Sequence, residues 1–172
     1  METARRSELA DACGYGYCRA HSRWFWGMRL HRCCAPAGTP RAAILAPADQ
    51  PEREVALRLL PHALHGGEQI VCDKGYAGRE FAEEVEARFG AEILRPNRKD
   101  EPADTLHLSA IRQRIESVFW TLKDRLGLEC HRARTLIGLR ARVAAKLLAL
   151  AAGVWLNSWL GLPSRGFAQL AA

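Results

Sequence analysis

The stretch that decides the fold is residues 69–94, QIVCDKGYAGREFAEEVEARFGAEIL. It opens on a short apolar run, Gln69–Cys72, which ends at Asp73 and a glycine turn, as a buried strand does. Residues 78–89 follow with an acidic, helical pattern that a glycine ends, and residues 91–94 form a second short apolar run before a proline. This order of strand, helix and strand predicts an α/β fold.

Upstream of this unit the sequence predicts a β-hairpin and a helix. Aromatic and apolar side chains alternate with basic ones over residues 24–34, a turn sequence follows, and residues 41–46 form the second arm. Residues 51–60 begin with proline and acidic residues, which favour the first turn of a helix. Residues 1–22 show no periodicity, and we expect irregular structure there.

Downstream, a polar, proline-bearing loop is expected over residues 95–107, and two helices follow, over residues 108–126 and about 136–159. The first of them has one apolar stripe at helical spacing, made of Ile111, Ile115, Val118, Phe119, Leu122 and Leu126. The predicted division is a lead-in (residues 1–22), one main domain (23–162) and a tail (163–172).

The composition fits one soluble globular domain, and its charge balance suits a polyanionic partner without establishing one. The 172 residues are 48% hydrophobic and 26% charged, which is ordinary for a folded chain. The net charge of +6 is concentrated between Arg112 and Lys146, a stretch with nine basic and three acidic side chains. Local positive charge of this kind suits a nucleic acid partner.

The sequence pattern argues against a disulfide-bonded secreted protein, a zinc-binding protein and a membrane protein. Six cysteines occur without a signal-like start, so we expect reduced thiols, and no paired spacing of cysteines indicates a zinc site. The uncharged run of residues 147–164 is interrupted by glycine, asparagine and proline, and it is read as a core helix rather than a membrane span. We therefore expect a cytoplasmic protein with no membrane contact.

Two positions carry the candidate chemistry. Asp73 lies at the carboxyl end of a strand, where α/β sheets place ligand-binding side chains, although an aspartate there also simply begins a turn. On the 108–126 helix, the 3.6-residue period places Arg112, Glu116 and Lys123 on one flank beside the apolar stripe. The alternative for Arg112 and Glu116 is an ordinary i,i+4 pair on a solvated helix.

Taken together, these motifs and their spacing resemble those of the DDE transposases of bacterial insertion sequences. Residues 73–76, Asp-Lys-Gly-Tyr, are similar to the block around that family's second catalytic aspartate. Glu116 resembles the final catalytic glutamate of a Y-x2-R-x3-E-x6-K signature, in which Arg112 and Lys123 match and Ser109 replaces the tyrosine. Two further blocks, residues 17–30 and 46–53, resemble the family's second-strand region and the passage after it.

The resemblance implies a ribonuclease H-like mixed sheet with flanking helices and an enzyme that cleaves and joins DNA strands. It implies Mg2+ or Mn2+ held by Asp73 and Glu116, because hard cations take carboxylate oxygens. It implies DNA, both transposon ends and target, as the partner, and a possible homodimer in the full-length enzyme. Arg112 and Lys123 would lie near the scissile DNA or brace Glu116.

The resemblance also predicts a truncated copy. In the family the first catalytic aspartate lies on the first strand, upstream of a segment like residues 2–10, and Asp11 does not match its block. We therefore expect the chain to lack that strand, that carboxylate and the family's amino-terminal DNA-binding region, and to be inactive alone. A stand-alone nuclease would need a third carboxylate, such as Asp49 or Asp104, without motif support.

The alternative function is a non-catalytic DNA-binding remnant that uses the basic helices. In either case we expect phosphate contacts, which are independent of base sequence and sensitive to salt. Trp120 is read as a core residue rather than as a base-stacking platform. The predicted DNA-binding residues are Lys74, Arg114, Lys123, Arg125, Arg132 and Arg134.

Overall fold

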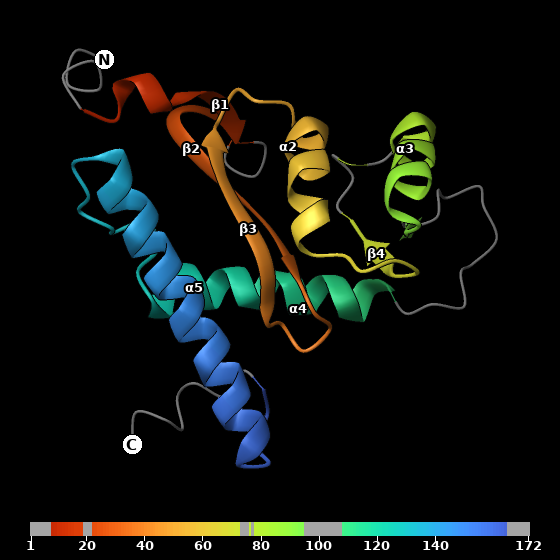
Figure 1. Cartoon of the computed structure of the whole chain (residues 1–172). Helices are drawn as coiled ribbons and strands as arrows, with labels where there is room; N and C mark the ends of the chain where they lie inside the picture. The colour runs from red at the N-terminus through yellow and green to blue at the C-terminus, as the bar shows by residue number, and fades with distance from the viewer. Residues whose placement is uncertain (1–7, 19–21, 73–75, 77, 95–107, 165–172) are drawn as a thin grey trace.

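The computed structural model describes residues 8–18, 22–72, 76, 78–94 and 108–164. Figure 1 shows the arrangement of the elements in space. In chain order they are η1 (Ala10–Ala12), β1 (Gly14–Cys18), β2 (Arg23–Cys34), β3 (Pro40–Pro47), α2 (Glu52–Leu59), η3 (Leu60–His62), β4 (Gln69–Val71), α3 (Arg79–Phe89), β5 (Glu92–Leu94), α4 (Leu108–Trp120), a π turn η5 (Thr121–Arg125) and α5 (Leu136–Trp159).

Strands β1, β2 and β3 form an antiparallel sheet in that order, which confirms the predicted hairpin. The prediction that the whole lead-in is irregular is wrong, because β1 pairs with the first half of β2. Its glycines hid the strand pattern. A side chain at Gly16 would collide with the ring of Phe25, so the bare backbone is what allows this close pairing.

The predicted strand, helix and strand of residues 69–94 is confirmed as β4, α3 and β5. The two strands pair in parallel, with Ile70 beside Ile93, and α3 connects them. Ala56 of α2 and Leu60 of η3 pack with Phe81 and Val85 of α3 in one buried cluster. Helix α2 lies between the hairpin and α3 in Figure 1, so it joins the two sheets into one body.

The two faces of β2 contact different partners, because side chains alternate along a strand. On one face, Arg29 pairs with Glu52 of α2. On the other face, Met28 and Leu30 pack against α5 through Leu139 and its neighbours. The hairpin is therefore a central layer with α2 on one side and α4 and α5 on the other.

Helices α4 and α5 cross and share a core, in which Val118, Leu122, Leu150 and Val154 are buried. The predicted helix over 108–126 is regular only to Trp120, and the last turn is wound as a π turn in which the Leu126 amide donates to the Thr121 carbonyl. The hydroxyl of Thr121 donates to the Ser117 carbonyl, which disturbs the regular ladder at this point.

The α/β class is confirmed, and the strands that the structure describes form two separate sheets, one antiparallel and one parallel. The ribonuclease H-like arrangement stays a prediction. None of the six cysteines, all of which lie in the described ranges, forms a disulfide. Within the described ranges, none of the helices has the length and apolar character that crossing a bilayer requires.

Candidate functional site

The tip of the β2–β3 hairpin holds the middle of α4. At Gly38 the backbone has φ +97°, and a side chain there would approach Val118 to 2.9 Å, so the helix can lie this close only to a glycine turn. Next to it, Arg114 donates from Nη1 to the Pro36 carbonyl at 3.4 Å. The hairpin turn therefore contacts α4 on both sides of Glu116.

Arg32 of β2 makes the central contact of this junction. Its Nη2 donates to the Ile115 carbonyl at 3.2 Å, and its guanidinium carbon lies 3.8 Å from the centre of the Phe119 ring. Burial lowers the pKa of the guanidinium. Because the acceptor is the carbonyl directly before Glu116, Arg32 positions the backbone from which Glu116 projects.

Glu116 itself faces away from the hairpin. Its side chain is exposed, and no hydrogen bond or ion pair of its carboxylate is found among the residues described. Arg112 lies one helical turn earlier in α4, but its side chain is outside the described part of the chain. The helix thus presents an exposed carboxylate to solvent from a backbone that is held on its opposite side.

Asp73 and Lys74 lie outside the described residues, but the residues that flank them are described. Strand β4, which leads to Asp73, contacts α4. On the other flank, the hydroxyl of Tyr76 and Nδ1 of His31 are hydrogen-bonded at 3.2 Å. The segment with Asp73 is therefore bracketed by a strand that touches α4 and by a tyrosine tied to β2.

Lys123 lies within the π turn, where the angular step of a regular helix no longer applies. Its ammonium group forms an ion pair with Glu129 at 2.7 Å, and both side chains are more than half exposed. The structure therefore directs Lys123 toward the loop after α4 and not toward Glu116. Such π turns interrupt α-helices frequently at functional sites.

The other predicted DNA-binding residues lie on α4, the π turn and the loop before α5. Arg125, Arg132 and Arg134 are exposed, as is Arg114. Arg125 lies 3.9 Å from the Asp124 carboxylate, a weak exposed pair. In contrast, Arg142 and Lys146 of α5 donate to the carbonyls of His131 and Leu126, so they stabilise this loop.

The prediction that Trp120 is a core residue is wrong. Its side chain is 53% exposed, and the guanidinium carbon of Arg125 lies 5.2 Å from its ring centre. The apolar stripe turns inward through Val118 and Leu122 instead, and Trp120 is displaced from Val118 by about 200° at 100° per residue. An exposed tryptophan beside an arginine is a surface on which a base can stack.

A divalent cation fits the chemistry of the predicted pair of carboxylates, and an exposed glutamate is the kind of ligand that it needs. Among the described residues, no three histidine, cysteine or acidic side chains come together as a metal site. Asp49 is exposed beside Gly14, and Asp104 lies outside the described residues.

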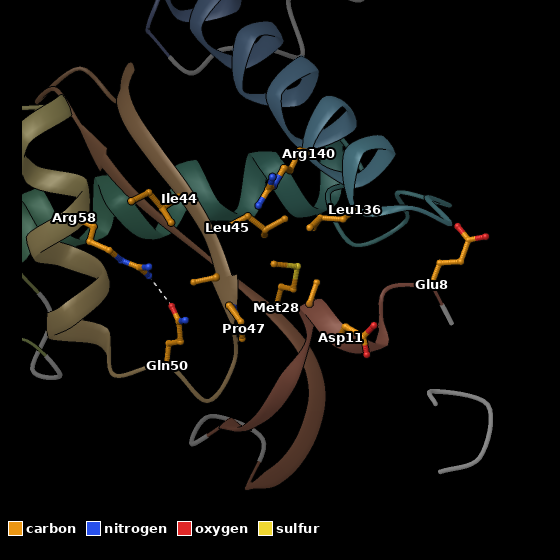
Figure 2. Close-up of a pocket in the computed structure, with 12 residues that line it drawn as sticks. Glu8, Asp11, Met28, Ile44, Leu45, Pro47, Gln50, Arg58, Leu136 and Arg140 are labelled. Carbon is orange, nitrogen blue, oxygen red and sulfur yellow. Dashed lines mark hydrogen bonds between the residues drawn. The ribbon is translucent and has the colours of Figure 1, made fainter. Parts of the chain in front are cut away.

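Figure 2 shows a pocket of about 520 Å³ between η1, the hairpin and the start of α5. Its polar lining includes Glu8, Asp11, Arg58 and Arg140, and at one side of it Arg58 donates to Gln50 at 2.6 Å. None of the predicted site residues lines this pocket. It is distinct from the α4 surface and has no part in the proposed chemistry.

Sequence reasoning missed the residues that hold the site together, namely Arg32, Gly38, His31 and Tyr76. The signal for the two basic residues was present, because they interrupt an otherwise apolar strand. His31 is buried and Arg32 half-buried, on opposite faces of β2. Gly38 was read only as a turn residue, since its contact with α4 spans 80 residues of sequence.

Comparison with known proteins gives one match. A family model described as a transposase DDE domain matches residues 5–152. No curated protein and no solved structure matches the chain significantly. The matched range includes the hairpin, β4 and its flanking residues, the whole of α4 and the greater part of α5.

Proposed function

The chain belongs to the transposase DDE-domain family, and on this premise we propose that it acts in DNA transposition through the surface of α4 around Glu116. The observation that carries the proposal is the junction between the hairpin and α4. It fixes the backbone next to Glu116 through Arg32 and Gly38, yet leaves the carboxylate exposed and unpaired among the described residues. The backbone is thus held while the carboxylate stays open to a ligand from solvent.

We assign metal binding to Glu116 together with Asp73, and the expected ions are Mg2+ or Mn2+. What supports the pair is the contact of β4 with α4 and the match of both residues to the family pattern. When bound, such ions activate an attacking hydroxyl and stabilise the leaving oxygen of a phosphodiester. The chain's own part is to supply the carboxylates and to hold them in place.

DNA is expected to lie along α4 and the loop that follows it. Arg112, with Lys74 from the Asp73 segment, would neutralise phosphates near the carboxylates. The contact would extend along α4 and the loop after it through Arg114, Lys123, Arg125, Arg132 and Arg134. Trp120 would stack on an unpaired base. Since transposition joins two DNA ends, the proposal includes two copies of the chain acting together as a homodimer.

We expect the 172-residue chain to be inactive alone, because only two carboxylates match the family's set of three. The test is to incubate the purified chain with supercoiled DNA and Mg2+ or Mn2+ and to measure nicking. No nicking above background is expected. Nicking that is lost in Glu116→Gln but kept in Glu86→Gln, an exposed glutamate on α3, would contradict this expectation.

The alternative, a DNA-binding protein without catalysis, is favoured by the exposed pair of Trp120 and Arg125. Binding would be measured by fluorescence anisotropy over a salt series. Trp120→Ala and Arg125→Ala should weaken binding of single-stranded DNA, and Arg79→Ala on α3 is the control. Binding that is unchanged by Mg2+ and by Asp73→Asn supports the alternative, whereas metal-dependent binding lost in Asp73→Asn supports the carboxylate pair.

A further inference from the structure

Strand β3 forms one edge of the antiparallel sheet. It pairs with β2 on one side, and no other strand that the structure describes pairs with it. The amide of Ala48 donates to the carbonyl of Gly27, and this bond fixes the alternation of the antiparallel ladder. Counted back from this pair, the even-numbered residues of 42–46 bond to β2, so Ala43 and Leu45 direct their N–H and C=O groups to the free edge.

This edge lacks the features that protect most edge strands from pairing with another chain, namely charges, prolines and bulges. Residues 42–46, Ala-Ala-Ile-Leu-Ala, are uncharged, and the register shift of the hairpin lies before them. Arg41 bounds the stretch at one end, and Pro47, which has no N–H, bounds it at the other. The free N–H and C=O groups between them are a template for an additional strand.

The pocket in Figure 2 passes around this edge. Its lining includes Ile44 and Leu45, whose side chains project to opposite faces of the sheet. It also includes Arg58 of α2 and Arg140 of α5, one from each of the helices that flank β3. A sheet separates its own two faces, so a hollow lined from both of them must enclose the edge. The free edge of β3 therefore lies in a hollow between α2 and α5.

The charges of the pocket indicate what kind of segment fits it. Arg58 and Arg140 are exposed and lie on opposite sides of β3 in Figure 2. Arg58 donates to Gln50, whereas the Arg140 guanidinium has no partner among the residues described. Side chains of an added strand alternate between the two sides, so two successive acidic residues would each meet one guanidinium. Glu8 and Asp11 line the pocket beside η1 and favour a basic residue toward that end.

We propose that the free edge of β3 is a docking site for another protein, which adds an extended segment to the sheet as a further strand. The segment carries two successive acidic residues, placed beside Arg58 and Arg140. Backbone hydrogen bonds with Ala43 and Leu45 supply affinity, and the two arginines supply selectivity. The inference rests on the hairpin and its flanking helices, and it does not depend on the proposed DNA chemistry of α4.

The first test measures hydrogen exchange of the β3 amides in the free chain by NMR. The amides of Ala43 and Leu45 should exchange about 100-fold faster than those of Ile44 and Ala46, which donate to β2. Protection of all four amides at low protein concentration would show that the same chain covers the edge, and the proposal would be wrong. Protection that grows with protein concentration would assign the edge to a second copy and would equally contradict a different partner.

The second test uses the labelled peptide acetyl-Lys-Thr-Val-Asp-Glu-Val-Thr-amide and fluorescence anisotropy. An antiparallel strand places the leading lysine of this peptide at the η1 end. The peptide should bind the full chain and slow the exchange of the Ala43 and Leu45 amides. A version N-methylated at each peptide bond cannot donate to β3, and a version with two lysines for the acids lacks the charge match, so each should bind at least about 10-fold more weakly. Absence of binding up to about 1 mM, or equal binding of the N-methylated version, would overturn the proposal.

Variants of the chain test the same site from the other side. Ala43→Pro removes an outward N–H and leaves the ladder to β2 intact, so it should weaken the peptide about 10-fold, whereas Ala43→Ser keeps the N–H and is the matched control. The double variant Arg58→Glu with Arg140→Glu should weaken it about as much, and Arg79→Glu, at an exposed position on α3, should not. Circular dichroism checks the folding of each variant, and the arginine variants decide if Ala43→Pro does not fold. Full affinity in a folded Ala43→Pro, or in the double variant, would contradict strand addition at this edge.

Discussion

Helices α4 and α5 pack against each other, and both have an outward face, but the two faces differ in kind. The outward face of α4 and its π turn is polar and bears Glu116, Lys123 and Arg125. The outward face of α5 is apolar and bears Leu148 and two tryptophans. A polar face with an exposed carboxylate suits charged ligands, and an uncharged apolar stripe suits another apolar surface.

The difference also extends to how each helix is held. Helix α4 is fixed by the hairpin through a half-buried arginine and a glycine turn, so one residue of its outward face has a defined position. Helix α5 is held by apolar side chains along its buried face, with Arg142 and Lys146 fixing the loop that precedes it. The junction at α4 therefore fixes the backbone position of a residue, whereas α5 exposes an apolar surface.

The largest expected effect separates the two faces of α5. Leu150 is fully buried between α4 and α5, so Leu150→Ala should lower the free energy of unfolding by about 2–5 kcal/mol. Leu148→Ala, two residues earlier and 70% exposed, should change it by less than about 0.5 kcal/mol. Urea titration of the wild type and the two variants measures both values.

Equal losses in the two variants would mean that Leu148 is packed as tightly as Leu150. The distinction between a buried and an open face of α5 would then be wrong.

The second prediction concerns the glycine against α4. Gly38→Ala should destabilise the chain by about 1–3 kcal/mol, because alanine at φ +97° is strained and its Cβ meets Val118 at 2.9 Å. Gly66→Ala is the control, since Gly66 has φ +101° with nothing within 4 Å and loses only the conformational part. Thermal unfolding compares the two, and an equal cost would show that the close approach to α4 contributes nothing.

These residues also show how far the sequence alone leads. Most elements were predictable because periodicity is local, and the hairpin, α2, β4, α3, β5 and α5 all follow from residues near in sequence. The role of Glu116 was inferred from family spacing, and the structure does not test it. Strand β1 was not predicted because its alternate glycines leave no hydrophobic pattern to detect. The same glycines allow its close pairing with β2.

What the sequence did not predict depends on contacts between distant residues. Arg32 reaches Ile115 across 83 residues, and no local pattern reveals which carbonyl a strand arginine will bind. Trp120 was wrongly predicted to be buried. The apolar stripe of α4 indicates only which side of the helix faces the core, and Trp120 lies just outside that stripe. Lys123 lies in a π turn, whose angular step differs from that of the regular helix on which the prediction for its direction was based.

The third prediction compares two arginines of β2 that face opposite sides. Arg32→Met should lower the free energy of unfolding by about 1–3 kcal/mol, because the Ile115 carbonyl loses its donor and Phe119 its cation. Arg29→Met breaks the partly exposed pair with Glu52 and should cost no more than about 1 kcal/mol. Arg32→Lys should recover only part of the loss, because lysine lacks the planar fork.

Hydrogen exchange of the α4 amides distinguishes the two arginines further. Faster exchange at residues 115–120 is expected in Arg32→Met and not in Arg29→Met. Similar exchange in both variants would contradict the positioning role of Arg32.

The smallest expected effect is a pH dependence on the other face of β2. His31 is buried, and burial lowers the pKa of its imidazole, with Glu52 opposing this shift and Arg29 and Arg58 adding to it. Because the folded state then binds the proton less readily than the unfolded state, stability is complete above about pH 6.5 and falls as the pH drops below it. Urea titrations between about pH 5 and 7.5 should show this fall in the wild type, and His31→Gln should flatten it. The hydrogen bond to Tyr76 makes the local consequence specific, since protonation turns both ring nitrogens into donors and leaves a charge beside the hydroxyl of Tyr76. A profile that is identical in His31→Gln would place the titrating group elsewhere and leave the His31–Tyr76 contact without a role in stability.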